Sequence, residues 1–224
     1  MKRESCNRCQ RPLPVCLCSS LPVSAIDNHW PLHILQHQQE KGHAINTAQI
    51  AVLGLAQCQL HTVTDAPVED TLPAAVLAEL SNAVLIYPGS DSRDVAQITS
   101  QELAYRPLLL LDASWRKSRR MLFASPWLQT LPRISFALTS PSRYRIRKEP
   151  LANYCSSLEA LCVVLGSLEK NFAKYAPLLT TMDVMIEQQI EKMSEATYRR
   201  NYLPESRELR ESREPYAPEE SQDD

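Results

Sequence analysis

An aspartate and a tryptophan follow an apolar run, and four cations come directly after them. The stretch PLLLLDASWRKSRRM covers residues 107–121 and places Asp112 and Trp115 where the apolar run ends. A carboxylate can act as a general base or hold an amino group, and an indole ring can stack on a flat or cationic ligand. The structural alternative is that a buried strand ends, the acid caps the next helix, and the helix shows its charges to water. The stretch alone leaves both interpretations open.

Four cysteines close together form the second group of chemical interest. The segment CNRCQRPLPVCLC holds Cys6, Cys9, Cys16 and Cys18. A structural Zn²⁺ takes four soft ligands in tetrahedral geometry, and two close cysteine pairs joined by a short turn supply such a set. The second pair, Cys-x-Cys, is tighter than the usual spacing, and a redox pair or inert thiols are the alternatives. We predict a zinc knuckle over residues 1–25.

Positive charge is concentrated in the middle of the chain. Ten lysines and arginines face one acid between Arg106 and Lys148, although the whole chain has a net charge of −2. Such a region suits the phosphates of a polyanion, and Tyr144 among the cations can stack on a splayed-out base. A solvated charged face and packing of Tyr144 on a strand are the structural alternatives.

Apolar runs alternating with helical patterns must position these residues. We predict strands over residues 29–37, 82–89, 106–112 and 133–138, and helices over residues 43–58, 156–170 and 178–202. Continuous apolar strands separated by helices indicate the α/β class, with a parallel sheet covered on both faces. Ligands of such sheets bind at the carboxyl ends of the strands. Pro88-Gly89, Asp112 to Trp115 and Thr139 to Ser142 lie at such ends.

Composition argues against several classes of protein. The hydrophobic fraction of 44% and charged fraction of 22% are typical of a soluble globular protein. No apolar run reaches the roughly 18 residues of a membrane span and the start lacks a signal peptide, so we expect a cytoplasmic protein without membrane contact. With four glycines, neither a Rossmann GxGxxG nor a P-loop is present. Cys58, Cys155 and Cys162 lie in apolar helical patterns and are expected in the core.

Several segments in a fixed order resemble the DTW-domain family, named for an Asp-x-Thr/Ser-Trp motif after a buried strand. LDASWRKSRRM carries the motif, with Ser114 where threonine is more common. The four-cysteine N-terminus, LQHQQE with NTA further on, IYPG, and SRYRIRKEP followed by SSLEA match companion segments in order. The resemblance covers roughly residues 5–202, and the bacterial members that the chain most resembles are tRNA-uridine aminocarboxypropyltransferases.

The resemblance implies a fold, a reaction and a partner. The fold is a SPOUT-like knotted α/β domain over residues 26–203, between the zinc knuckle and a disordered acidic tail over residues 204–224. The reaction transfers the 3-amino-3-carboxypropyl group of S-adenosylmethionine to N3 of a uridine in the tRNA variable loop and releases 5′-methylthioadenosine. The expected partner is tRNA, and no protein partner is predicted. A methyltransferase of the same fold and a non-catalytic zinc-ribbon RNA-binding protein are the alternatives.

The matched segments also imply site residues. Asp112, Ser114 and Trp115 are the expected catalytic residues. Asp112 is expected to act as the base or to hold the cofactor's amino group, with a low pKa because cations surround it in the sequence. Trp115 is expected to stack on the cofactor or line its pocket, with core packing as the structural alternative.

The resemblance also implies cofactor-binding and RNA-binding residues at the matching positions. With Asp112 and Trp115, the expected cofactor-binding residues are Pro88, Gly89, Leu111, Thr139, Ser140, Leu158, Glu159 and Ala160. The expected RNA-binding residues are Arg116, Lys117, Arg119, Arg120, Arg143, Tyr144, Arg145, Arg147 and Lys148. His37, Glu40 and Asn46 lie in a matched segment without a role that the residues suggest, and a structural histidine is favoured at position 37.

Overall fold

A six-stranded sheet with all its strands parallel forms the centre of the computed structural model, which describes residues 4–104, 106–138, 140–146 and 155–202. The spatial order is β2-β1-β5-β3-β6-β4. The strands are β1 (Leu32–His37), β2 (Cys58–Val63), β3 (Val84–Ile86), β4 (Arg93–Asp94), β5 (Leu108–Asp112) and β6 (Arg133–Ser135). The predicted α/β class with a parallel sheet is therefore confirmed.

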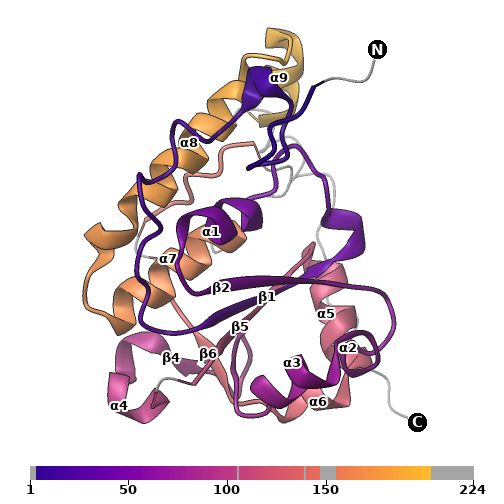
Figure 1. The fold of residues 1–224 in the computed structure, drawn as a ribbon, viewed down its shortest axis with the longest axis vertical. Coiled ribbons are helices and arrows are strands. Elements are labelled where there is room, and N and C mark those ends of the chain that lie inside the picture. The colour runs from indigo at the N-terminus through magenta and orange to yellow at the C-terminus, as the bar shows by residue number, and fades with distance from the viewer. Residues whose placement is uncertain (1–3, 105, 139, 147–154, 203–224) are drawn as a thin grey trace.

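Helices cover both faces of the sheet (Figure 1). One face carries α1 (Ala48–Gly54), α7 (Ser157–Leu168) and α8 (Ala176–Ile190); the other carries α2 (Val68–Thr71), α3 (Ala74–Glu79), α5 (Trp115–Ala124) and α6 (Pro126–Thr130). The short α4 (Ser100–Leu103) follows β4, and α9 (Glu195–Tyr202) ends the described chain. Short 3₁₀ turns lie at Leu13–Val15, Gln38–Glu40, Val95–Gln97 and Phe172–Tyr175.

Strand β5 explains why the apolar runs are continuous. Side chains alternate between the two faces of a strand, so Leu108 and Leu110 pack under α1 and α7 whereas Leu109 and Leu111 pack against α5 and α6. Both faces are covered, so every position of the strand except the last is apolar. Asp112 is the first residue of β5 that the two cores do not hold.

The predicted helix over residues 43–58 extends too far, and the prediction that Cys58 lies in a helix is wrong. Helix α1 ends at Gly54, and Cys58 begins the edge strand β2. An edge strand pairs on one side only, and β2 is mostly half-exposed, so its polar residues gave no strand signal. The two-residue β4 also went unpredicted. Cys155 and Cys162 pack in the core as predicted.

The predicted helix over residues 178–202 is interrupted. Helix α8 ends at Ile190 and α9 begins at Glu195. Ser194 separates them because its hydroxyl accepts a hydrogen bond of 3.2 Å from the amide of Thr197, which is the geometry of a helix N-cap.

The strand order places the later strands inside the sheet. Strand β5 lies between β1 and β3, and β6 lies between β3 and β4. The carboxyl ends of β3, β5 and β6 are therefore neighbours although 49 residues separate Ile86 from Ser135 in the chain. Residues that are distant in the sequence meet at this edge.

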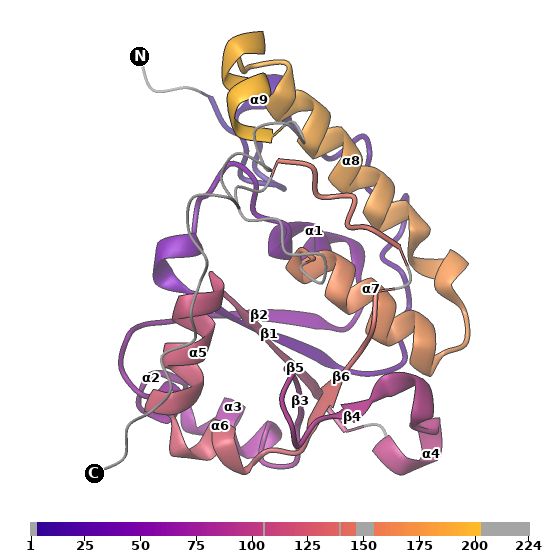
Figure 2. The ribbon, with the colours of Figure 1, turned by 180° about the vertical axis from the view of Figure 1, so that it is seen from behind.

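The N-terminal segment runs beside α8 and α9 in both views (Figures 1 and 2). Leu17 and Leu21 pack into the same core as α1 and α8, and the Thr181 hydroxyl of α8 donates a hydrogen bond to the carbonyl of Ser20. Across the part of the chain that the structure describes, no helix combines the length and apolar character needed to cross a membrane.

Candidate functional site

A cavity of about 1000 Å³ opens at the carboxyl ends of β3, β5 and β6. Pro88 and Gly89 line it after β3, Asp112 and Trp115 after β5, and residues 136–138 after β6. The position is the one at which parallel α/β sheets bind ligands. Of the remaining predicted residues, the cavity is also lined by Leu111, Ser114, Tyr144 and Ala160.

Three predicted cofactor-binding residues do not line the cavity. Leu158 is fully buried in the core that α7 shares with α1 and α8. Glu159 is 6% exposed and turns back on its own helix end. Ser140 is exposed outside the cavity. Thr139, Arg147 and Lys148 lie outside the described residues.

Two hydrogen-bond donors from distant elements hold the Asp112 carboxylate. Its Oδ2 accepts from Nε2 of Gln36, at the end of β1, over 2.7 Å. Its Oδ1 accepts from the hydroxyl of Ser157, the first residue of α7, over 2.5 Å. Gln36 Nε2 also lies 3.2 Å from Oδ1 of Asn46. The carboxylate is therefore fixed in orientation at the wall of the cavity.

Burial raises the pKa of Asp112 above its ordinary value. The hydrogen bonds from Ser157 and Gln36 oppose this effect, and the negative charge of Glu40 adds to it. The prediction of a low pKa is wrong, because burial outweighs the other effects and no cation of α5 contributes to the pKa shift; Lys117 and Arg120 pair with Glu40 and Asp65 instead. A raised pKa makes Asp112 a stronger base than an exposed aspartate.

Gln36 and Ser157 are site residues that sequence reasoning did not assign. Gln36 is a polar residue at the end of a buried strand, and it is 2% exposed. A polar residue in a buried strand could have indicated a site residue, because a buried side-chain amide needs hydrogen-bond partners. Ser157 is the first residue of α7, next to the N-cap Ser156, and no local pattern distinguishes it from a residue that only begins the helix.

Trp115 begins α5 and lines the cavity rather than the core. Its ring stacks on Tyr87, with centroids 5.4 Å apart and planes within 10°. Tyr87 is buried at the end of β3, whereas Trp115 is 38% exposed. The pair thus presents an aromatic wall that is anchored on one side and accessible on the other.

Glu159 ties the loop after β6 to the start of α7. Its carboxylate accepts hydrogen bonds from the Ser142 hydroxyl, the Arg143 amide and the Ser156 amide, at 2.7–3.0 Å. The Ser156 side chain in turn accepts from the Glu159 amide, which completes a capping box. Glu159 therefore positions the loop that carries the predicted RNA-binding residues Arg143 and Arg145.

Four of the predicted RNA-binding cations form ion pairs with acids from other elements. Lys117 Nζ lies 2.8 Å from Glu40, and Arg120 lies 3.6 Å from Asp65. On the opposite side of the cavity, ion pairs join Arg143 to Asp183 and Arg145 to Glu187, both acids being on α8. The count of one acid among ten cations along the chain therefore overstates the positive charge of the folded site.

Of the three residues without an expected role, two lie at the cavity and one is buried. Glu40 and Asn46 line the cavity. His37 is 1% exposed; its Nε2 lies 3.3 Å from Asp65, and its Nδ1 accepts from the amide of Gln39. The favoured structural role of His37 agrees with these contacts.

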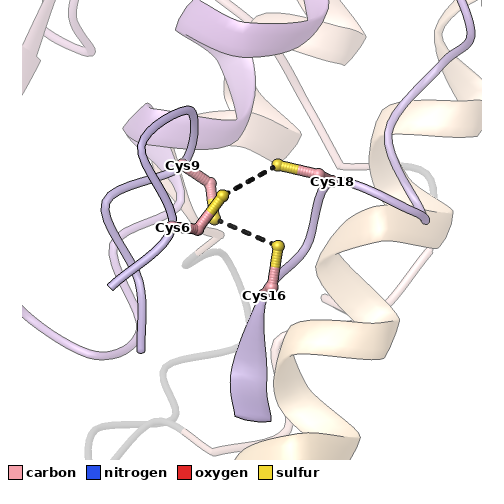
Figure 3. Close-up of side chains that lie close together, drawn as sticks. All are labelled: Cys6, Cys9, Cys16 and Cys18. Carbon is pink, nitrogen blue, oxygen red and sulfur yellow. Dashed lines mark hydrogen bonds between the residues drawn. The ribbon is translucent and has the colours of Figure 1, made fainter. Parts of the chain in front are cut away.

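The four N-terminal cysteines gather into one cluster (Figure 3). The Sγ atoms of Cys6 and Cys18 lie 3.6 Å apart, those of Cys9 and Cys16 lie 3.7 Å apart, and all four lie within 4.8 Å of one another. Tetrahedral zinc with bonds of about 2.3 Å to sulfur requires sulfur separations of about 3.8 Å. The cluster therefore has the dimensions and ligand type of a four-thiolate metal site.

Local hydrogen bonds prepare one thiolate of the cluster. The backbone amides of Cys9 and Arg8 lower the pKa of Cys6 to about 6. Burial and the neighbouring sulfurs raise the pKa of Cys18 to about 12 when no cation is present. A bound dication deprotonates coordinating thiols, so it would hold all four cysteines as thiolates.

The chain is similar to known proteins over most of its length. The DTW domain family matches residues 3–190. A Mus musculus protein named tRNA-uridine aminocarboxypropyltransferase 2 is 25% identical over 90% of this chain and 69% of its own length. Its Drosophila melanogaster namesake is 28% identical over 75% and 68%, and Arabidopsis thaliana tRNA-uridine aminocarboxypropyltransferase A is 24% identical over 75% and 74%. No solved structure matches. The chain belongs to the DTW domain family.

Proposed function

We propose that this protein transfers the 3-amino-3-carboxypropyl group of S-adenosylmethionine to N3 of a uridine in the variable loop of tRNA. The proposal rests on the names of the relatives and on one observation: the Asp and Trp of the family motif, Asp112 and Trp115, line the same large cavity. Ligand pockets span about 300–1000 Å³, so this cavity has room for both a cofactor and a base. We place the protein in the cytoplasm, with its tRNA substrate.

Asp112 supplies the proton acceptor of the reaction. It takes the N3 proton of the uridine, a bond forms between N3 and the aminocarboxypropyl carbon, and the bond from that carbon to sulfur breaks. The electron pair of the broken bond stays on sulfur, which leaves as 5′-methylthioadenosine. Gln36 and Ser157 keep the carboxylate aimed into the cavity. The same carboxylate can instead hold the amino group of the methionine part, and in that case it orients the electrophile.

Product analysis tests this function. The protein is incubated with an unmodified tRNA transcript and S-adenosylmethionine, and nucleosides and small products are identified by mass spectrometry. We expect 5′-methylthioadenosine together with a uridine that carries the aminocarboxypropyl mass. S-adenosylhomocysteine with a methylated nucleoside identifies a methyltransferase instead, and tRNA binding without either product identifies a non-catalytic RNA-binding protein.

The domain organisation and two structural details belong to the same proposal. Cys6, Cys9, Cys16 and Cys18 hold a structural Zn²⁺ in a knuckle over residues 1–25, supported by the sulfur separations. Residues 26–203 form the catalytic domain in this proposal, and the predicted acidic tail over residues 204–224 lies outside the described residues. We also propose that the chain of the catalytic domain forms the SPOUT-like knot. The strand order supports this, because β5 and β6 lie between strands that come earlier in the chain. Pulling the chain from its two ends tests the knot, because a knotted chain stops short of full extension.

The paired arginines of the loop give a prediction on tRNA affinity. Asp183 and Glu187 compete with RNA phosphates for Arg143 and Arg145. The double variant Asp183→Asn/Glu187→Gln is expected to bind tRNA more tightly, by about 3- to 10-fold, since exposed ion pairs are worth up to about 1 kcal/mol each. Titrations at two salt concentrations measure the effect.

The matched control is Glu102→Gln. It removes an ion pair of the same kind, with Arg93, while glutamine retains the capping box of α4, from which no described residue lines the cavity. We expect this variant to bind tRNA like the wild type. Weaker binding by the double variant means that the acids hold the arginines in their binding orientation.

A further inference from the structure

Helix α5 exposes an aromatic and cationic stripe whose residues belong to neither core cluster. Trp115, Arg119 and Phe123 are four residues apart, so they lie on one face of the helix. Trp115 is 38% exposed and Phe123 is 63% exposed. The guanidinium carbon of Arg119 lies 5.8 Å from the centroid of the Phe123 ring. We call these three side chains the α5 stripe.

The stripe is distinct from the packing face of the helix. Helix α5 buries Ser118, Met121 and Leu122 against the sheet. An isolated surface phenylalanine needs no explanation. Phe123, however, continues a row that begins with the cavity residue Trp115 and contains a cation between its two rings.

Exposed arginines within the stripe and along one side of it indicate its occupant. Arg116 and Arg120 follow the stripe residues by one position and are exposed. Among the described residues, Arg116 and Arg119 form no ion pair, in contrast to the cations of the loop after β6. Aromatic rings between arginines bind single-stranded nucleic acid, because bases stack on the rings while the cations meet the phosphates. A second copy of the chain fits less well, since a two-fold contact would bring these arginines against their own copies.

We propose that the α5 stripe stacks the unpaired nucleotides next to the target uridine, with Trp115 at the mouth of the cavity and Phe123 at the outer end. This inference rests on the proposed function, because it takes tRNA as the substrate. It adds a binding residue, Phe123, and a direction in which the RNA strand leaves the cavity, along α5. The α5 stripe is expected to bind splayed-out, unpaired bases in preference to double-stranded RNA.

Binding of full-length variants to RNA tests the stripe. The probes are an unmodified tRNA transcript, a twelve-nucleotide single strand and a duplex of the same length. Phe123→Leu removes the ring but keeps an apolar side chain on an exposed helix position, and Phe123→Tyr keeps the ring. Phe172→Leu is the matched control, since Phe172 is 59% exposed and lies in the 3₁₀ turn between α7 and α8. Helices α7 and α8 cover the opposite face of the sheet from α5 (Figures 1 and 2).

Phe123→Leu is expected to weaken binding of the tRNA and the single strand by about 5- to 10-fold, with the duplex unchanged. The slope of log affinity against log salt is expected to stay at the wild-type value, whereas Arg119→Gln lowers it by about one. Phe123→Tyr and Phe172→Leu are expected to bind within twofold of the wild type.

Three results overturn the inference: wild-type binding by Phe123→Leu, an equal loss on duplex RNA, or a changed oligomeric state of that variant in sedimentation. The last result assigns the stripe to a protein interface. These outcomes do not depend on turnover. A wild-type protein that forms no aminocarboxypropyl product refutes the proposed function, and the binding comparison still decides the stripe.

Discussion

Asp112→Ala and Asp112→Asn are expected to lower transfer by about 10²- to 10⁴-fold, the contribution typical of a positioned general base. The carboxylate lies at the cavity wall, and each of its oxygens accepts a hydrogen bond. Among the described acids that line the cavity, only Asp112 is held by two such donors. Affinity for tRNA is expected to remain near the wild-type value, because Asp112 is not among the residues that meet phosphates. Single-turnover rates and equilibrium binding measure the two quantities separately.

The unfolding temperature of Asp112→Asn shows whether a loss of transfer comes from unfolding. Burial raises the pKa of Asp112 in the folded state, so folding favours its protonated form. That preference is fully present at pH values below the unfolded pKa and is lost as the pH rises through the folded pKa, so the ionised carboxylate costs stability above it. Asp112→Asn is therefore expected to unfold at or above the wild-type temperature. Undiminished transfer by this variant contradicts the catalytic assignment.

The pH profile tests whether transfer needs the ionised form of Asp112. Ser157 donates to Asp112 and lowers its pKa, so Ser157→Ala is expected to move the acid limb of kcat/KM to higher pH. Ser157→Thr keeps the hydroxyl and is the matched control, expected to retain the wild-type limb. An acid limb that does not respond to Ser157→Ala means that the limb reports a different group.

Cys9→Ser is expected to remove the bound metal and to lower the free energy of unfolding by several kcal/mol. Structural zinc contributes about 10–16 kcal/mol of binding free energy in small zinc-binding peptides, and Cys9 is 2% exposed within the cluster. The adjoining residues Leu17 and Leu21 pack into the main core, so the loss should reach beyond the knuckle. Metal analysis and thermal unfolding, each with and without a chelator, measure the effect.

The matched control is Cys58→Ser, the same change at a cysteine on β2 that lies outside the cluster. Burial raises the pKa of Cys58 to about 12, so it is a protonated core thiol and its replacement should leave the metal content unchanged. Purified wild-type protein without metal, in which Cys6 and Cys9 form a disulfide, refutes the zinc proposal.

Local patterns determined a large part of this protein. Four of the strands were predictable because burial on both faces favours apolar residues, and β5, which is apolar at every position but the last, is the clearest case. The cysteine cluster was predictable because its members are close in sequence. The position of Asp112 at a ligand-binding edge followed from the same strand pattern.

Only the tertiary structure decided what surrounds those residues. Gln36 and Ser157 reach Asp112 from 76 and 45 residues away, and Asp183 reaches Arg143 from 40 residues away. Contacts over such distances are set by strand order and helix packing, which leave no trace in local periodicity. The direction of the Asp112 pKa shift depends on burial and partners in space, so counting neighbours along the chain gave the opposite sign. The sequence alone thus located the acid, and the folded structure determined its chemistry.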